Sequence, residues 1–229
     1  MPIHLQREIE RLKKLVLSLS ATVEKDLRQA VKAVAERDTA LAKQVIEKDI
    51  EIDQAEIDVE EECLKILALH QPVAIDLRYI VAVMKLTNDL ERIGDLAVNV
   101  AERAEFINSR VRVEIPFDFA GLAEKTQAML RNSLDALVHM DAELARHVCT
   151  VDDEVDAINR QMYDQVKDMI RAHPDQVDVL IAMLSVSRYL ERVADHATNI
   201  AEDVLYTIEG HIVRHGRELA AKSKMPAIL

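Results

Sequence analysis

The stretch KLTNDLERIGD, residues 85–95, recurs in related form as SVSRYLERVAD at residues 185–195. This recurrence indicates that the chain is built from two similar units. Each stretch carries a Glu followed four residues later by an Asp: Glu91 and Asp95, then Glu191 and Asp195. On a helix, residues four apart lie side by side, and like charges at that spacing cost about 0.2–0.5 kcal/mol. An unfavourable arrangement that occurs twice in one chain indicates a shared constraint.

The similarity extends well beyond these two stretches. Upstream, DTALAKQVIEKDIEID from Asp38 aligns with DAELARHVCTVDDEVD from Asp141. We therefore predict an internal duplication of a three-helix unit, each unit an antiparallel bundle with short connections. Residues 81–104 align with residues 181–204 without a gap, and the residues identical to their counterparts are Ala82, Leu90, Glu91, Arg92, Asp95, Ala97, Asn99, Ala101 and Glu102.

Composition and periodicity predict an all-α protein of two tandem three-helix bundles. The 229 residues are 49% hydrophobic and 31% charged and include only four Gly and five Pro, as in long packed helices. Apolar residues recur at three- and four-residue steps. The predicted helices cover about 5–38, 38–71, 73–108, 118–140, 141–172 and 175–209, with a linker at 109–119. The predicted domains are a first repeat at 1–110, a second at 116–215 and a tail at 216–229.

Charge narrows the classes of partner. Lys and Arg total 29 against 41 Asp and Glu, a net charge of −12, so we expect no nucleic acid partner and membrane contact only through other proteins. The N-terminus has charges where a signal peptide needs an apolar run, and no long uncharged stretch occurs. Cys63 and Cys149 lack motif spacing, which favours reduced thiols in a cytoplasmic protein.

The direction of the repeated acids leaves two interpretations open. At 100° per residue, Glu91, Asp95 and Glu102 lie within about 40° of one another and opposite the apolar stripe, so we expect them to point out of the core. They form either an ordinary solvated face, with Arg92 pairing to Asp95, or a binding site.

Divergence between the two copies indicates a shared constraint on the acids, which weakens the interpretation as an ordinary solvated face. Asn88 and Asp89 became Arg188 and Tyr189, whereas the acids are unchanged.

Carboxylates predict a site for hard cations. Together with Asn99 and Asn199, they offer only oxygen ligands, which suit Mg²⁺, Mn²⁺, Ca²⁺ or iron better than Zn²⁺. Two acids on one helix are too few for tight binding, so waters or acids from neighbouring helices must contribute. The candidates for this contribution are Asp49, Glu51, Asp53 and Glu56, and at the equivalent place Asp152, Asp153, Glu154 and Asp156. Acidic runs of this kind are more often ordinary solvated faces.

Several enzyme signatures are missing from the sequence. His211 and His215 have zinc-ligand spacing, but the Glu of H-E-x-x-H is absent. No His stands three residues after a Glu, as di-iron bundles require, and no Gly-rich phosphate loop occurs. These absences argue against a metalloprotease, a ferritin-like di-iron oxidase and a nucleotide-binding protein. A metal-storage or metal-dependent enzyme on an α-bundle and a purely structural helical scaffold stay open.

The motifs resemble those of the PhoU family over nearly the whole chain. LERIGD and LERVAD are each followed by an Asn and by AE, ALAKQVIEKD precedes them, and Gln71 to Arg78 match a QPxAxDLR element. The spacing of Tyr206, Gly210, Arg214 and His215 matches the end of the family pattern.

The resemblance implies a function and a set of partners. It implies two PhoU domains, a homodimer, and negative regulation of the phosphate-starvation response and of phosphate uptake. The implied role is that of a non-enzyme, a signalling adaptor whose partners are the ATPase subunit of a phosphate ABC transporter and a sensor histidine kinase.

The resemblance also implies metal ligands. Some family members bind metal clusters at the paired motifs, which extends a metal-binding role, with iron, manganese or magnesium, to Glu91, Asp95, Glu191 and Asp195. Ala194 stands where the signature usually has Gly.

Overall fold

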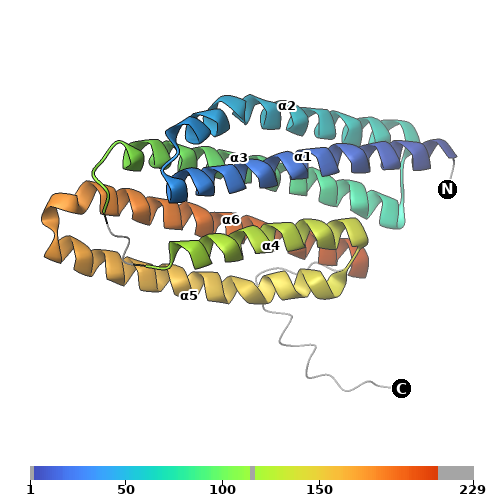
Figure 1. Cartoon of the computed structure of the whole chain (residues 1–229). Coiled ribbons are helices and arrows are strands. Elements are labelled where there is room, and N and C mark those ends of the chain that lie inside the picture. Colours follow the sequence, from blue (N-terminus) through green and yellow to red (C-terminus); the bar gives the residue numbers. More distant parts are fainter. Residues whose placement is uncertain (1–2, 114–116, 211–229) are drawn as a thin grey trace, which may run out of the picture.

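The computed structural model describes residues 3–113 and 117–210, and these residues are almost entirely helical (Figure 1). No strand occurs among them, so the all-α prediction is confirmed. The helices of the described ranges are α1 (Ile3–Glu36), α2 (Thr39–His70), α3 (Ala74–Asn108), α4 (Phe119–His139), α5 (Ala142–Ala172), the short 3₁₀ helix η1 (Pro174–Gln176) and α6 (Val177–Glu209).

Aspartates begin three of these helices. The Asp38 carboxylate accepts a hydrogen bond from the backbone N–H of Leu41 at 3.0 Å, at the start of α2. Asp141 accepts two such bonds at the equivalent start of α5, and Asp118 accepts one at the start of α4. These oxygens satisfy N–H groups of the first turn that have no partner within the helix.

The turns before α2 and α5 share an unusual backbone conformation. Arg37 and Met140 occupy equivalent positions and both have positive φ, 57° and 51°. The Arg37 guanidinium donates hydrogen bonds to the carbonyl groups of Ile107, Asn108 and Arg110 at 2.9, 3.0 and 2.5 Å. These hydrogen bonds connect the turn between α1 and α2 to the C-terminal end of α3.

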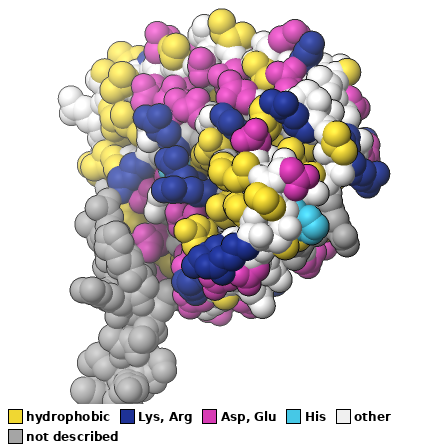
Figure 2. All heavy atoms as spheres, turned by 90° about the vertical axis from the view of Figure 1, so that its left-hand side faces the viewer, with side chains coloured by type: hydrophobic (Ala, Val, Ile, Leu, Met, Phe, Trp, Pro, Cys, Tyr) yellow, Lys and Arg dark blue, Asp and Glu magenta, His cyan; other side chains and the backbone are white. Residues whose placement is uncertain are grey.

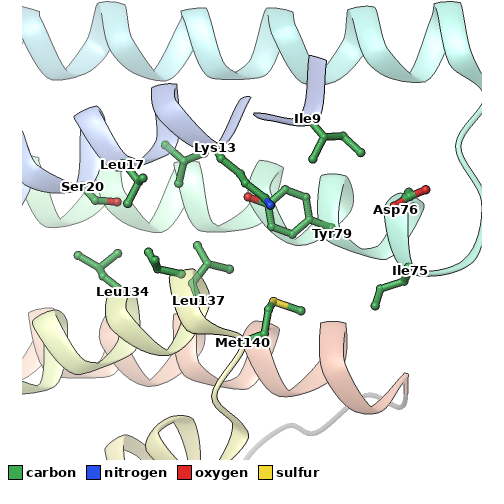
Figure 3. Close-up of a pocket in the computed structure, with 12 residues that line it drawn as sticks. Ile9, Lys13, Leu17, Ser20, Ile75, Asp76, Tyr79, Leu134, Leu137 and Met140 are labelled. Atoms are coloured by element: carbon green, nitrogen blue, oxygen red, sulfur yellow. The ribbon is translucent and has the colours of Figure 1, made fainter. Parts of the chain in front are cut away.

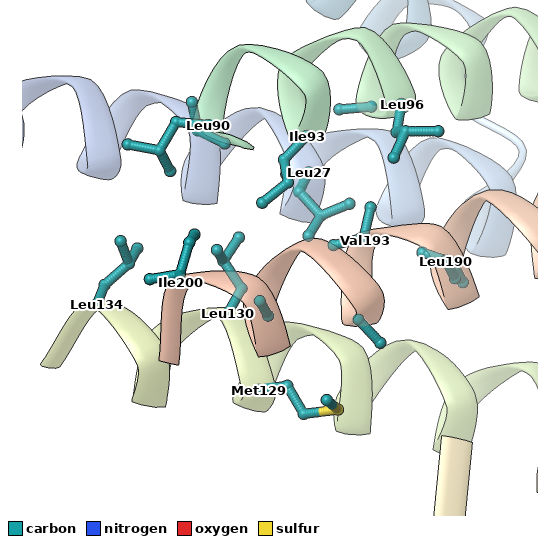
Figure 4. Packing of buried hydrophobic residues seen from close by; sticks show 14 of the residues in the cluster. Leu27, Leu90, Ile93, Leu96, Met129, Leu130, Leu134, Leu190, Val193 and Ile200 are labelled. Atoms are coloured by element: carbon teal, nitrogen blue, oxygen red, sulfur yellow. The ribbon is translucent and has the colours of Figure 1, made fainter. Parts of the chain in front are cut away.

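The core lies around α3 and α6, which pack against each other along the middle of the molecule. Helices α1 and α2 cover α3, and α4 and α5 cover α6 (Figure 1). In Figure 4, Leu27 and Ile93 of the first repeat lie close to Val193 and Leu130 of the second. The two predicted three-helix units are therefore present, and they share one continuous hydrophobic core.

Polar contacts also join the two repeats. The Lys85 ammonium lies 2.9 Å from the Asp203 carboxylate, and Nδ1 of His196 lies 2.7 Å from Oδ1 of Asp89. The Arg78 guanidinium bonds to the carbonyl of Thr207 at 3.4 Å, near the end of α6. This contact connects the start of α3 to α6. Within the described ranges, no helix is long and apolar enough to cross a membrane.

Candidate functional site

Each repeat contains an acidic cluster at the seam between its second and third helices. The first acidic cluster consists of Asp49, Asp53 and Glu56 on α2 and Glu91 and Asp95 on α3. The second acidic cluster consists of Asp152 and Asp156 on α5 and Glu191 and Asp195 on α6. The four acids singled out by sequence thus face further carboxylates from a neighbouring helix.

The acids were expected to point out of the core into water, but at the seam they are partly buried. The side chain of Glu91 is 20% exposed and that of Asp95 is 44% exposed, so neither extends freely into water. Glu91 also has a buried oxygen, Oε2, that accepts no hydrogen bond. A helical wheel treats a helix alone, whereas α2 packs beside these acids and removes water from one side of them.

Carboxylates repel one another in the first acidic cluster. Removal from water raises the pKa of Glu91, and the neighbouring charge of Asp95 raises it further. The pKa of Asp49 is raised by burial and then by the charges of Asp53 and Asp95, and burial and neighbouring carboxylates raise the pKa of Glu56. Ionisation is therefore less favourable here than in water, which a bound cation would reverse.

The second acidic cluster is perturbed more strongly. Burial and the charges of Asp195 and Asp156 raise the pKa of Asp152 to about 6, while the Thr198 hydroxyl lowers it. The pKa values of Glu191 and Asp195 are also raised, first by removal from water and then by neighbouring carboxylates.

Arg92 lies beside the acid pair of α3 and reduces the repulsion between the two carboxylates. Nε of Arg92 lies 3.4 Å from Oε2 of Glu91, and Nη1 lies 3.5 Å from Oδ2 of Asp95. The i,i+3 pairing of Arg92 with Asp95 is confirmed, and the same guanidinium also contacts Glu91. The positive charge of Arg92 thus partly offsets the repulsion between Glu91 and Asp95. The Arg92 side chain is 53% exposed, so it can also rotate into solvent.

Other side chains named from the sequence do not all join the clusters. The Asn99 amide bonds to the carbonyl of Asp95 in its own helix, and that of Asn199 bonds to Asp89 on α3. Glu51 and Asp153 are exposed, and Glu154 is exposed and paired with Lys125. His211, Arg214 and His215 lie outside the described residues.

Neither cluster resembles a preformed metal centre. Across residues 3–113 and 117–210, no three His, Cys, Asp or Glu side chains converge well enough to hold one ion. The two cysteines belong to the packing: Cys63 is buried, Cys149 is partly buried, and burial raises the pKa of each thiol to about 12. Cys63 belongs to the hydrophobic core, and Cys149 packs at its edge.

An apolar groove of about 240 Å³ lies where the two repeats meet on another face of the molecule (Figure 3). Helix α1 contributes Ile9 and Leu17, α3 contributes Ile75 and Tyr79, and the end of α4 contributes Met140. The groove has no local signal in the sequence, because its walls come from three helices and each helix adds only one or two exposed apolar residues.

The end of the bundle where α3 ends and α6 begins carries mixed charge (Figure 2). Acidic side chains gather toward its upper edge, with Lys, Arg and hydrophobic side chains below them. On this face the described atoms form no broad basic surface of the kind that binds nucleic acid.

The fold and its clusters define a class: duplicated three-helix proteins with one acidic cluster in each repeat. The family model described as the PhoU domain matches residues 16–104 and 119–204, and the chain belongs to the PhoU family.

Named relatives and solved structures agree with this assignment. A phosphate-specific transport system accessory protein PhoU homolog of Pseudomonas putida is 37% identical over 213 residues, covering 91% of this chain and 82% of that protein. The crystal structure of PhoU from Pseudomonas aeruginosa has a TM-score of 0.86 and 36% identity, covering 90% of this chain and 99% of its own. The phosphate transport system regulatory protein PhoU from Streptococcus pneumoniae has a TM-score of 0.81 and 27% identity, covering 92% and 100%.

Proposed function

We propose that this protein is a non-catalytic adaptor that regulates phosphate transport. It would connect the ATPase subunit of a phosphate ABC transporter with a sensor histidine kinase and restrain the phosphate-starvation response and phosphate uptake. Support comes from PhoU family membership and from relatives named as accessory proteins of phosphate-specific transport. The proposal places the protein in the cytoplasm, where two unpaired thiols remain reduced, and makes it a homodimer, which sedimentation at several concentrations tests.

Metal binding at the two acidic clusters is the second part of the proposal. The observation that carries it is the recurrence of one carboxylate arrangement, half-buried and mutually repelling, at equivalent seams of both repeats. Glu91 and Asp95 with Asp49, and Glu191 and Asp195 with Asp152, would turn toward a shared ion. Oxygen donors alone favour iron, manganese or magnesium.

A bound cation would also change what the clusters present to a partner. Without metal, each cluster is an anionic surface that suits Lys or Arg side chains of another protein. With metal, that charge is partly neutralised. Partner and cation therefore compete, and equal partner affinity with and without saturating Mn²⁺ would argue against this exchange.

The test uses purified partners and a charge-matched control. The quadruple variant Glu91→Gln/Asp95→Asn/Glu191→Gln/Asp195→Asn removes the pairs on α3 and α6. The control replaces four exposed acids outside both clusters and loses the same net charge: Asp58→Asn, Glu61→Gln, Glu124→Gln and Asp164→Asn. Bound metal is measured by mass spectrometry, and binding of the ATPase subunit and of the kinase by interferometry.

The outcomes separate the three classes of function. The adaptor predicts that wild type and control bind both partners, while the quadruple variant loses metal. A metal-dependent enzyme predicts turnover or redox activity that depends on Glu91 or Glu191. A structural scaffold predicts no bound partner and identical metal content in all three proteins.

A further inference from the structure

The outer face of α2 carries three exposed aliphatic side chains in a row. Ile50, Ile57 and Leu64 are 73%, 47% and 55% exposed. They stand seven residues apart, nearly two full turns, so they form one line along about 21 Å of the helix. The buried residues Ile52 and Val59 lie on the opposite side of α2. Helix α2 forms the upper edge of the molecule in Figure 1, and among the described residues it packs only against α1 and α3. The aliphatic row therefore faces away from the bundle.

Helix α5 of the second repeat has charged residues at the positions equivalent to this aliphatic row. The caps Asp38 and Asp141 align α2 with α5 at a constant offset, at which most buried residues of the two helices coincide. The residues equivalent to the row are Asp153, Arg160 and Lys167, and all three are exposed. Single exposed apolar residues are common on protein surfaces and need no explanation. Three at one helical spacing, at positions that the other repeat keeps charged, indicate a binding surface.

Acids border the aliphatic row on both sides. Between positions 47 and 64 of α2, the exposed residues other than the row and Gln54 are all acidic, and they are Glu47, Glu51, Asp53, Asp58, Glu60 and Glu61. If the row of a second copy packed here, these acids would face the same acids of that copy, and like charges across an interface repel. The surface is complementary instead to a helix that has Lys or Arg beside its apolar residues.

We propose that the aliphatic row of α2 is a docking surface for one amphipathic helix of a partner protein, which presents apolar residues at seven-residue spacing with Lys or Arg on both sides of them. The apolar residues pack against the row and the basic ones pair with the bordering acids, as the core and flanks of a two-helix coiled coil do. Three aliphatic residues bury little area, so the contact is a transient one. The inference goes beyond the adaptor role and holds whether or not the acidic clusters bind metal.

The experiment measures binding of two synthetic helical peptides to the full chain. Both peptides span about three heptads and carry the same apolar residues at seven-residue spacing, one with Lys and the other with Glu beside them. The row variant is Ile50→Gln/Ile57→Gln/Leu64→Gln, which leaves the net charge unchanged. The matched control replaces three exposed apolar residues outside α2: Val111→Gln, Tyr163→Gln and Ile181→Gln. Fluorescence anisotropy with a metal chelator present gives the affinities, and circular dichroism checks folding.

A charge-reversal variant tests the bordering acids separately. Glu60→Lys/Glu61→Lys leaves the aliphatic row intact and changes the charge on one side of it. Wild type and control should bind the Lys peptide, and the row variant should bind it at least about tenfold more weakly. The charge-reversal variant should lose affinity for the Lys peptide and gain affinity for the Glu peptide. This exchange of preference requires that the peptide lies beside the row.

Three results would overturn the proposal. No binding of the Lys peptide to the wild-type protein would mean that the row is no docking surface. Equal binding of that peptide to wild type and the row variant would show only a general attraction between a basic peptide and an acidic protein. Sedimentation in which the wild type self-associates and the row variant does not would make a second copy the occupant. None of these measurements depends on metal, on the ATPase subunit or on the kinase, so the proposed function is tested separately.

Discussion

The two repeats keep the same pairs of acids and differ in what surrounds them. Gly94 in the first repeat approaches Ile52 so closely that an added Cβ would lie 3.0 Å from its Cδ1. The second repeat has Ala194 at the equivalent place, and Val155, one carbon smaller, stands where the first has Ile52. Packing partners have therefore changed together, whereas the acids did not change. The helix seams therefore tolerate repacking, and packing alone does not explain why the carboxylates are the same in both repeats.

The largest expected effect is on the core that the repeats share. Leu27→Ala and Leu130→Ala each remove a fully buried side chain from equivalent positions of α1 and α4. Each should lower the free energy of unfolding by about 2–5 kcal/mol. Because the core is continuous, denaturant titration followed by circular dichroism should give one transition in both variants. Two separated transitions in either variant would mean that the repeats unfold independently.

Glycine at the two turns should have opposite effects. Arg37→Gly removes the guanidinium that bonds three carbonyl groups at the end of α3, and should destabilise by about 2–3 kcal/mol. Met140→Gly removes a side chain from a left-handed position where it makes no such bonds, and should stabilise by up to about 1 kcal/mol. Thermal unfolding of both variants checks the signs, and a loss of stability in Met140→Gly would contradict the comparison.

Exchange of the packing pair tests compensation at the seams. Gly94→Ala places a methyl group against Ile52, and Ile52→Val makes room for it. The double variant should be more stable than the sum of the single changes predicts, with a coupling of about 1 kcal/mol. Denaturant titration of the four proteins in the cycle measures this value. If the effects of the two single changes on the free energy of unfolding were additive, the Ile52 side chain would accommodate the added methyl group without an energetic penalty.

The smallest expected effect concerns pH and the second acidic cluster. The pKa of Asp152 is about 6 in the folded protein against an ordinary 3.8, so the folded state holds this proton more tightly than the unfolded state. Its contribution to stability is present below about pH 4 and is lost as pH rises to about 6.

Replacement of Asp152 should therefore reduce the loss of stability that occurs as the pH rises from about 4 to about 6. Metal-free Asp152→Asn should melt about 1–3 °C higher than wild type at pH 7 and equally at pH 4. Asp164→Asn, at an exposed position of the same helix, is the control and should change neither value. A lower melting temperature of Asp152→Asn at pH 7 would contradict the prediction.

Sequence reasoning predicted the helices well because their signals are local. Apolar periodicity depends only on residues within one helix, and the internal duplication made it possible to compare each predicted helix with its counterpart in the other repeat. The apolar groove was not predicted, since its walls come from three helices. Asp49 and Asp152 were named among several acids, and only packing distinguishes them from exposed neighbours such as Glu51 and Asp153.

The packing of α3 on α6 bears on how such a chain can arise. A half-length ancestor that ended after α3 would expose the face of α3 that packs against α6, and would have to associate with a copy of itself to bury that surface. Joining two copies in one gene makes the association independent of protein concentration. From then on, each half can evolve separately as long as the contact surface is maintained. The pairing of Asp89 with His196 illustrates this separate evolution, because the equivalent positions of the other repeat hold Tyr189 and Leu96. The contact therefore exists in one direction only, and the two repeats are no longer interchangeable.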